Sequence, residues 1–191
     1  MLVLASASPR RADLLRAAGL RFTVAPVACD ERWLPGEAPA AYAARVAHEK
    51  ATLAVPAHPG AVILAADTTV WTDPGSPPIG KPADRAEAAG ILRMLAGRSH
   101  FVTTAFAIAD TRGPSVAWQR REVTTRVHMR PIPGDELEAY LDADDWRDKA
   151  GGYGIQSRAA GIVTAIEGSY TAVVGLPMAE VVVALRALEV T

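Results

Sequence analysis

The chain has 191 residues, half of them apolar, and a formal net charge of −1. This length and apolar content suit one domain, residues 1–191, with a sizeable buried core. The near-neutral charge disfavours nonspecific nucleic-acid binding, which depends on a basic surface, so nucleic acid is not an expected partner and any anion site must be local.

Cysteine content and hydropathy set the expected location. Cys29 is the only cysteine, which excludes a disulfide framework and a multi-thiolate metal site. The first residues lack a basic segment followed by a long apolar run, so we expect no signal peptide. No apolar run approaches the ~20 residues of a membrane span. We therefore expect a cytoplasmic protein without a membrane partner.

The first expected elements are a strand at residues 2–4, a turn of small residues and a helix. Ser8 suits the helix N-cap, and Pro9 suits the first position, where a missing N–H costs nothing. Arg10 and Arg11 then fall in the first turn, where the helix dipole favours acidic residues. A bound anion would resolve this conflict, because free N–H groups and two guanidinium groups make a phosphate or carboxylate site. Two solvated surface arginines are the alternative.

The helix is expected to end near Gly19, before a second strand at residues 22–27. A loop that contains Glu31 leads to a helix over residues 39–55. Lys50 lies on the inward stripe of this helix, so it either extends to the edge of the stripe, the commoner case, or points its charge into a cleft. The stripe comprises Tyr42, Val46 and Leu53.

Residues 61–66 form a continuous apolar run, as expected for a central strand that is covered on both faces. The run ends at Asp67. Open α/β sheets bind ligands at the carboxyl ends of such strands, so Asp67 is a candidate functional acid. Asp also caps turns, and position alone leaves that structural role open.

The next loop, residues 72–81, contains the spacing G-x-x-x-x-G-K of a phosphate-binding P-loop. Pro82 stands where that motif needs the serine or threonine that binds magnesium. Pro77 and Pro78 also remove two N–H groups from the cradle. We therefore reject a P-loop and keep Lys81 as a candidate phosphate contact.

A mixed sheet is expected from the middle of the chain. A helix capped at Asp84 should end at Gly97, followed by a strand over residues 100–109 and an antiparallel partner over residues 116–129. The apolar alternation changes parity within that partner, which predicts a bulge at residues 120–122. Antiparallel pairing beside parallel strands makes the sheet mixed.

The last part of the chain is expected to hold a helix at residues 135–141, a strand at residues 162–166 and a helix after Pro177. The segment 144–156 between them is rich in charge and glycine. Its glycines either adopt positive φ or let a ligand approach the backbone closely.

Unusual polar residues, most of them cationic or acidic, recur at the expected strand ends and helix starts. Arg and Lys hold phosphates, carboxylates hold Mg²⁺ or Mn²⁺, and an acid can orient or deprotonate water. Taken singly, each residue is better explained by surface charge or a structural ion pair. Their shared placement favours phosphate chemistry. These residues are Ser6, Ser8, Arg10, Arg11, Glu31, Lys50, Asp67, Lys81, Asp148, Lys149 and Gln156.

Nine short motifs, in order along nearly the whole chain, resemble those of the Maf family of nucleoside triphosphate pyrophosphatases. They are ASASPRR at 5–11, DE at 30–31, EKA at 49–51, ADT at 66–68, GKP at 80–82, DKAG at 148–151, YGIQ at 153–156, GSY at 168–170 and VGLP at 174–177. The resemblance implies an α/β fold with a mixed β-sheet, flanking helices and two lobes around a deep cleft. It also implies hydrolysis of the α–β phosphate bond to a monophosphate and pyrophosphate, a divalent cation (Mg²⁺ or Mn²⁺), and a homodimer.

The resemblance implies roles for individual residues. Asp67 would accept a proton from water or bind the metal, and Glu31 would bind the metal or orient water. Base specificity would depend on Arg10, Thr68 and Gln156. The YGIQ form resembles the branch that acts on dTTP and UTP, and Gln156 has the donor and acceptor to read a pyrimidine edge. Contacts to the triphosphate would come from Ser6, Arg11, Lys50 and Lys81, and further substrate contacts would come from Ser8, Asp148 and Lys149.

Two alternatives to this enzyme remain. One is a nucleotide-binding regulatory protein, for instance of cell division, with little turnover; pure binding has less use for Glu31 and Asp67 than hydrolysis does. The other is a sugar or phosphate transferase, which would form product only with a second acceptor. The Pro-rich residues 73–78 and Gly152 depart from the family pattern and affect only the expected cleft rim.

Overall fold

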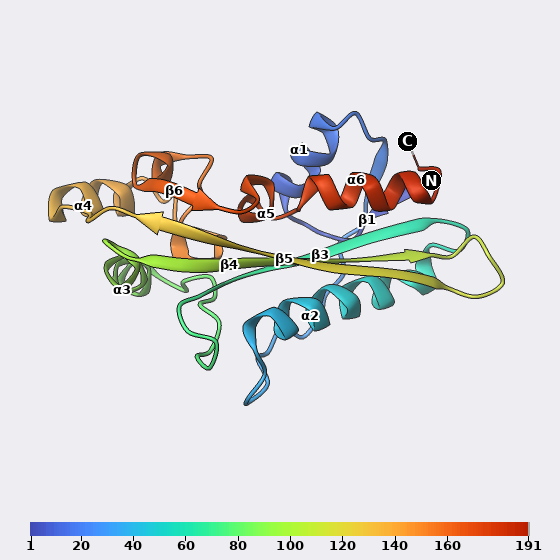
Figure 1. Ribbon diagram of the computed structural model, residues 1–191, viewed down its shortest axis with the longest axis horizontal. Helices are drawn as coiled ribbons and strands as arrows, with labels where there is room; N and C mark the ends of the chain where they lie inside the picture. The colour runs from blue at the N-terminus through green and yellow to red at the C-terminus, as the bar shows by residue number, and fades with distance from the viewer. Residues whose placement is uncertain (191) are drawn as a thin grey trace.

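The fold is built on a six-stranded mixed sheet in a computed structural model that describes residues 1–190 (Figure 1). The order across the sheet is β2 (Phe22–Val24), β1 (Leu2–Leu4), β3 (Val62–Trp71), β4 (Ser99–Asp110), β5 (Ala117–Met129) and β6 (Val163–Glu167). Strand β1 is parallel to β2 and β3, whereas β3, β4, β5 and β6 are antiparallel to one another in succession. The predicted mixed α/β sheet is therefore confirmed.

The helices flank this sheet on both faces (Figure 1). They are α1 (Pro9–Ala17), α2 (Pro39–Ala54), α3 (Arg85–Leu95), α4 (Gly134–Asp142), α5 (Tyr170–Val174) and α6 (Met178–Ala187), with short 3₁₀ turns at Val55–Ala57, Ala150–Gly152 and Arg158–Gly161. No helix among residues 1–190 has the length and apolar content that crossing a membrane requires.

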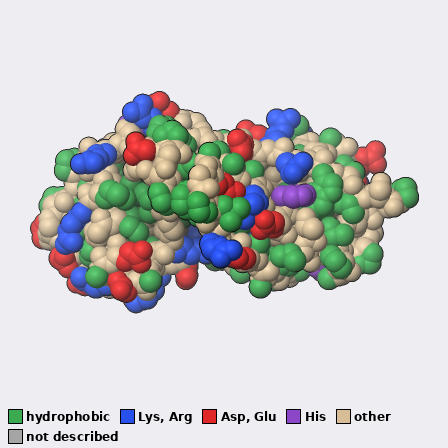
Figure 2. All heavy atoms as spheres, turned by 90° about the horizontal axis from the view of Figure 1, so that it is seen from below, with side chains coloured by type: hydrophobic (Ala, Val, Ile, Leu, Met, Phe, Trp, Pro, Cys, Tyr) green, Lys and Arg blue, Asp and Glu red, His purple; other side chains and the backbone are tan. Residues whose placement is uncertain are grey.

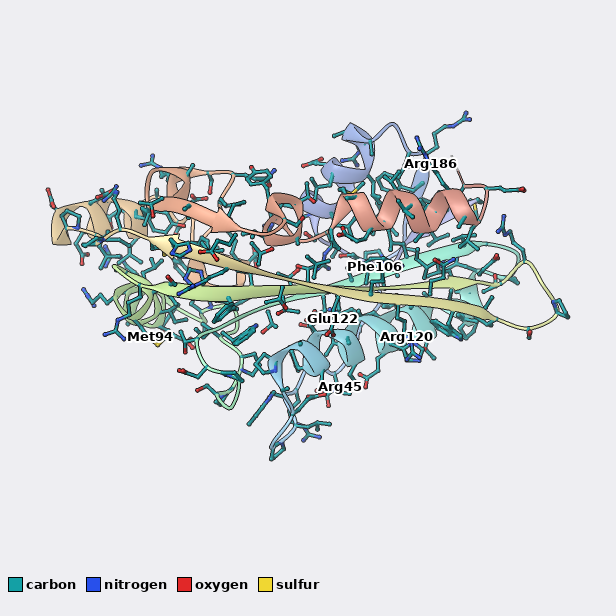
Figure 3. The ribbon with its side chains drawn as sticks, viewed as in Figure 1. Arg45, Met94, Phe106, Arg120, Glu122 and Arg186 are labelled. Carbon is teal, nitrogen blue, oxygen red and sulfur yellow. The ribbon has the colours of Figure 1, made fainter. Side chains whose placement is uncertain are left out.

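The central strands are covered on both faces because successive side chains of a strand point to opposite sides. Leu64 and Ala66 of β3 pack with α1 and α6, whereas Ile63 and Ala65 pack against α2. Phe106 of β4 points toward α6 (Figure 3). The uninterrupted apolar run before Asp67 is the result of this double coverage.

A separate core lies at the other end of the long strands. There Val70, Val102 and Val127 pack with Leu92 of α3 and the buried Trp146. Figure 1 shows α3, α4 and β6 gathered at this end, away from α1 and α6. The two cores form two lobes that share β3, β4 and β5.

Strand β3 does not end at Asp67, which corrects one prediction. The strand continues to Trp71, and Asp67 lies opposite Ala105 in an unbroken ladder with β4. Pairing along a long neighbouring strand, rather than the end of apolar sequence, decides where β3 stops. Asp67 is thus presented from the middle of a rigid strand.

The predicted bulge at residues 120–122 is also wrong. The ladder between β4 and β5 runs without interruption from the pair of Ser99 and His128 to the pair of Asp110 and Ala117. The alternation changes parity because different faces of β5 are covered at its two ends. Trp118 packs with the α2 side, and Val127 packs into the other core.

Three smaller predictions need correction. Strand β2 ends at Val24, three residues early, and α5 was not expected. Leu53 is 53% exposed instead of lying on the inward stripe of α2. Helix α2 instead turns small residues such as Ala43, Ala47 and Ala51 toward the sheet, which lets it approach the strands closely.

Candidate active site

A cleft of about 1090 Å³ lies between the two cores. Figure 2 shows acidic and basic side chains gathered where the two lobes meet. The cleft brings together every residue that the sequence predicts for substrate, base or metal, from both ends of the chain. Those lining it are Ser6, Ser8, Arg10, Arg11, Glu31, Lys50, Asp67, Thr68, Lys81, Asp148, Lys149 and Gln156.

Two carboxylates share one ammonium group in this cleft. Lys50 Nζ lies 2.8 Å from Asp67 Oδ1 and 2.7 Å from Glu31 Oε1. Lys50 and Asp67 are only 8% and 6% exposed, so each charge depends on the other for compensation. Odd-numbered residues of β3 face α2, which is why the two side chains meet. Of the two interpretations of Lys50, the charge that points into a cleft is correct.

Glu31 lies in the loop before α2 and is half-exposed. Partial burial alone would raise its pKa, but the hydrogen bond and charge of Lys50, with the charges of Lys81 and Arg11, hold the pKa of Glu31 below its usual value. Glu31 is therefore ionised at neutral pH. Tyr42 fixes this loop, because its hydroxyl donates to the Glu31 carbonyl at 2.8 Å.

Tyr42 is a cleft residue that the sequence analysis assigned to the apolar stripe of α2. Burial, and then the negative charges of Asp67 and Glu31, raise the pKa of Tyr42, so its hydroxyl keeps its proton. Its position eight residues before Lys50 on one helix face was the available signal. An amphipathic side chain on such a stripe fits a cleft as well as a core.

Arg11 is held by three hydrogen bonds from its guanidinium group. Nε donates to Gly175 O at 2.8 Å, Nη1 to Ser6 Oγ at 3.0 Å, and Nη2 to Thr68 Oγ1 at 3.2 Å. Burial lowers the pKa of Arg11, against the opposing effect of Asp67. A guanidinium group has five N–H donors, so one remains on each terminal nitrogen. Such a pair can bind a phosphate through two parallel hydrogen bonds.

The glycine-rich segment forms the opposite rim of the cleft. Arg10 Nη2 donates to Asp148 O at 3.2 Å, which links the start of α1 to this rim. Gly151 and Gly152 have φ of 73° and 69°, so they serve the backbone turn. Gly154 instead makes room, because a Cβ there would lie 2.7 Å from Lys149 Cε.

The remaining predicted cations and the specificity residue lie at the edge of the cleft. Lys149 Nζ pairs with Asp145 Oδ1 at 3.2 Å, and Asp145 is a lining residue that the sequence analysis missed. Lys81 is exposed and forms no ion pair with the residues that the structure describes. Gln156 is also exposed. Both side chains are therefore accessible to a ligand.

The donor set fits a divalent cation that arrives with its substrate. Among residues 1–190 no group of three or more His, Cys, Asp or Glu side chains is placed to hold a metal by itself. Glu31 and Asp67 nevertheless offer carboxylate oxygens on either side of Lys50. Mg²⁺ is commonly bound by one or two carboxylates together with substrate phosphates.

Comparison with known proteins links the chain to a family. Residues 1–188 match the family described as Maf-like protein. A solved structure of the Ham1 protein from Staphylococcus aureus aligns at 16% identity with 67% of this chain and 71% of that chain, with a TM-score of 0.46. The dTTP/UTP pyrophosphatase of Roseobacter denitrificans is 45% identical over 188 residues, which cover 98% of this chain and 96% of the relative. The dTTP/UTP pyrophosphatase of Hyphomonas neptunium is 48% identical over 180 residues, covering 94% and 91%.

Proposed function

The chain belongs to the Maf family, and from that premise we propose that it is a nucleoside triphosphate pyrophosphatase acting on dTTP, UTP or modified pyrimidine nucleotides. It hydrolyses the bond between the α- and β-phosphates and releases a nucleoside monophosphate and pyrophosphate. One observation carries the proposal most directly. Lys50 joins Asp67 and Glu31 in the same cleft that contains the partly unused guanidinium group of Arg11.

Asp67 is the proposed proton acceptor. Lys50 hydrogen-bonds to Asp67 Oδ1, and no described residue hydrogen-bonds to Oδ2. Oδ2 is therefore available to accept a proton from the attacking water. Lys50, Arg11 and Lys81 would neutralise the triphosphate and the charge that develops on the leaving pyrophosphate. Catalysis then consists mainly of positioning and charge stabilisation.

We place the nucleotide base and the remaining substrate contacts at the rim of the cleft. Arg10, Thr68 and Gln156 are the proposed specificity residues, and Gln156 is exposed and lines the cleft. Its amide can donate to a pyrimidine carbonyl and accept from the ring N–H. Ser6, Ser8, Asp148 and Lys149 complete the proposed contacts to the substrate.

We also propose that Glu31 and Asp67 hold Mg²⁺ or Mn²⁺ together with the substrate phosphates. When bound, such a cation would polarise the phosphate oxygens and stabilise the negative charge of the transition state. The proposal has a direct check. Chelation of divalent cations should abolish pyrophosphate release, and either metal should restore it.

A nucleotide panel tests the function. With Mg²⁺ or Mn²⁺, UTP and dTTP should yield pyrophosphate and not orthophosphate. Asp67→Asn should lower turnover by about 10²–10⁴-fold, the usual contribution of a general base, while Lys50 keeps its partner Glu31. Asp13→Asn is the matched control, since Asp13 is exposed and pairs with Arg16 outside the cleft.

Other outcomes of the panel separate the alternatives. Unchanged turnover in Asp67→Asn would remove Asp67 from the mechanism. Binding of UTP without any pyrophosphate would instead support a nucleotide-binding regulatory protein. Product that forms only with an added acceptor would indicate a transferase.

We further propose a cytoplasmic homodimer that has neither nucleic acid nor a membrane as a partner. The near-neutral charge disfavours nucleic acid and the single cysteine suits the cytoplasm, whereas the dimer is what the resemblance to the Maf family implies. Light scattering of the purified protein should give twice the mass of one chain, and the mass of one chain would refute the dimer.

A further inference from the structure

Thr104 of β4 lies behind Arg11 and outside the lining of the cleft. Its side chain is fully buried. Thr104 Oγ1 lies 2.6 Å from Ala172 O in α5 and 2.8 Å from Thr68 Oγ1. Thr68 Oγ1 in turn accepts from Arg11 Nη2 at 3.2 Å. Two hydroxyl groups therefore connect the guanidinium group to the backbone of α5.

The hydrogen bonds of this connection can run in only one direction. A carbonyl oxygen can only accept a hydrogen bond, so Thr104 uses its single hydroxyl proton to donate a hydrogen bond to Ala172 O. Thr68 must therefore donate its own proton to Thr104. The Thr68 oxygen then has only lone pairs to present on its other side, which is where the Arg11 N–H points.

Helix α5 holds Arg11 at a second point as well. Gly175, directly after the helix, accepts from Arg11 Nε at 2.8 Å. The other end of α5 is anchored to β5, because Ser169 caps the helix and Thr125 Oγ1 accepts from the Ser169 N–H at 2.9 Å. Helix α5 is thus fixed to the sheet near Ser169 and at Ala172, and it holds Arg11 at Gly175.

We propose that Thr104 is a positioning residue for Arg11. By accepting a hydrogen bond from the Thr68 hydroxyl, Thr104 turns the lone pairs of the Thr68 oxygen toward the guanidinium group of Arg11 and fixes the plane of that group. The two N–H donors left over then face the phosphates in a defined orientation. This inference rests on the proposed function, in which Arg11 binds the triphosphate. It gives the Thr68 hydroxyl the task of orienting Arg11, in addition to the specificity role proposed for Thr68 above.

Two valine variants test the proposal, because valine keeps the shape of threonine without the hydroxyl. Thr104→Val should lower kcat/KM for UTP about tenfold, the effect of losing one hydrogen bond that orients a charged group. Thr104→Ser should restore it. Thr103→Val is the matched control: Thr103 is equally buried, but its hydroxyl bonds to Trp71 Nε1 at 2.9 Å and Thr124 Oγ1 at 2.8 Å.

A double-mutant cycle with Arg11→Gln separates positioning from a general effect on folding. Thr104→Val should not lower kcat/KM further in the Arg11→Gln background, because the effects of substitutions at coupled residues are not additive. Equal losses in Thr104→Val and Thr103→Val would overturn the proposal. So would a loss from Thr104→Val that persists undiminished in the Arg11→Gln background.

A binding measurement keeps the inference separate from the activity itself. Calorimetry with inorganic triphosphate and Mg²⁺ uses a probe without base or sugar, and Thr104→Val should bind it about tenfold more weakly than wild type. Unchanged affinity would refute the inference. If wild type releases no pyrophosphate from any nucleotide, the proposed function fails, and this binding result still decides the role of Thr104.

If Thr104→Val does not fold, Thr68→Val removes the adjacent link at a half-buried position. It should weaken triphosphate binding to a similar extent and should also show no further effect in the Arg11→Gln background. Additive losses there would overturn the proposal.

Discussion

Lys50 holds together two carboxylates that would otherwise repel each other across the cleft. Its own contact with Asp67 is almost fully buried, and removal of one partner of a buried pair is costly because the other charge is left uncompensated. The residue therefore contributes to stability and to the proposed substrate site at once.

We predict that Lys50→Met lowers the free energy of unfolding by about 3 kcal/mol at pH 7. The loss should shrink toward pH 5, because Glu31 would lose the hydrogen bond and charge of Lys50 that lower its pKa while burial still raises it, so Glu31 would take up a proton more readily. Urea unfolding of wild type and variant at the two pH values measures both effects. A loss that is the same at pH 5 and pH 7 would contradict this explanation.

Lys81 is the matched contrast to Lys50, because it is exposed and unpaired among the described residues. We predict that Lys81→Ala leaves the free energy of unfolding within about 0.5 kcal/mol of wild type, as for most surface substitutions. The KM for UTP should nevertheless rise, since a cation near the triphosphate is lost. An unchanged KM would remove Lys81 from the substrate site.

Gln156 is exposed at the rim, so its removal should not affect folding. We predict that Gln156→Ala reduces the preference for UTP over GTP, measured as the ratio of kcat/KM values, by about tenfold. A base preference equal to that of wild type would show that other groups read the base.

At the scale of elements, β4 supports the glycine-rich rim through a buried contact. His100 Nε2 lies 2.6 Å from the Tyr153 hydroxyl, and His100 is fully buried. Burial, and to a smaller degree the charge of His128, lowers the pKa of His100 to about 4. This histidine is therefore neutral in the folded protein at neutral pH.

The lowered pKa predicts a pH dependence of stability. Between pH 6.5 and about 4 the unfolded chain binds a proton at His100 that the folded protein does not, so the free energy of unfolding falls as the pH falls. The free energy of unfolding falls by about 3 kcal/mol in total, and the decrease levels off below the pKa of His100 in the folded protein. Above pH 6.5 this contribution is fully present.

His100→Gln tests this effect because glutamine can still hydrogen-bond to Tyr153 but does not titrate. Urea unfolding at pH 6.5 and pH 4.5 should show a smaller decrease in the variant than in wild type. Carboxyl groups titrate in both proteins, so their effect cancels in the comparison. Equal decreases would assign the acid sensitivity to other groups.

On the scale of the whole molecule, the cleft lies between two lobes, and β3, β4 and β5 contribute to the packing of both. Its cationic groups come from both halves of the sequence, so a bound triphosphate would contact both lobes. A ligand that binds only the folded state stabilises it by about 2.7 kcal/mol at a hundred times its Kd.

We predict that a UTP analogue with an uncleavable α–β bond, at that concentration and with Mg²⁺, raises Tm by about 8 °C. Thermal unfolding followed by fluorescence measures the shift. Uridine at the same concentration is the control and should change Tm little. Equal shifts for the two ligands would show that the triphosphate is not the recognised group.

Local signals were enough to predict the mixed sheet, most of the helices and strands and the side-chain cap of α3. They missed α5, and Ser8 precedes α1 as expected but makes no side-chain cap hydrogen bond. Asp84 caps α3 by accepting from the Glu87 N–H, and Gly19 and Gly97 have positive φ after their helices. These features depend on a few neighbouring residues, so they can be read from the sequence. The motifs also identified many residues of the cleft through the family resemblance, but not Tyr42 or Asp145.

Only the tertiary structure decided how far β3 extends, which face of β5 is covered and where Lys50 points. These features depend on neighbours that are distant in sequence: β4 extends β3 past Asp67, α2 packs on one end of β5, and Asp67 draws the lysine inward. The chain from Arg11 through Thr68 to Thr104 has the same origin. A hydroxyl group has no preferred partner until the fold places one beside it.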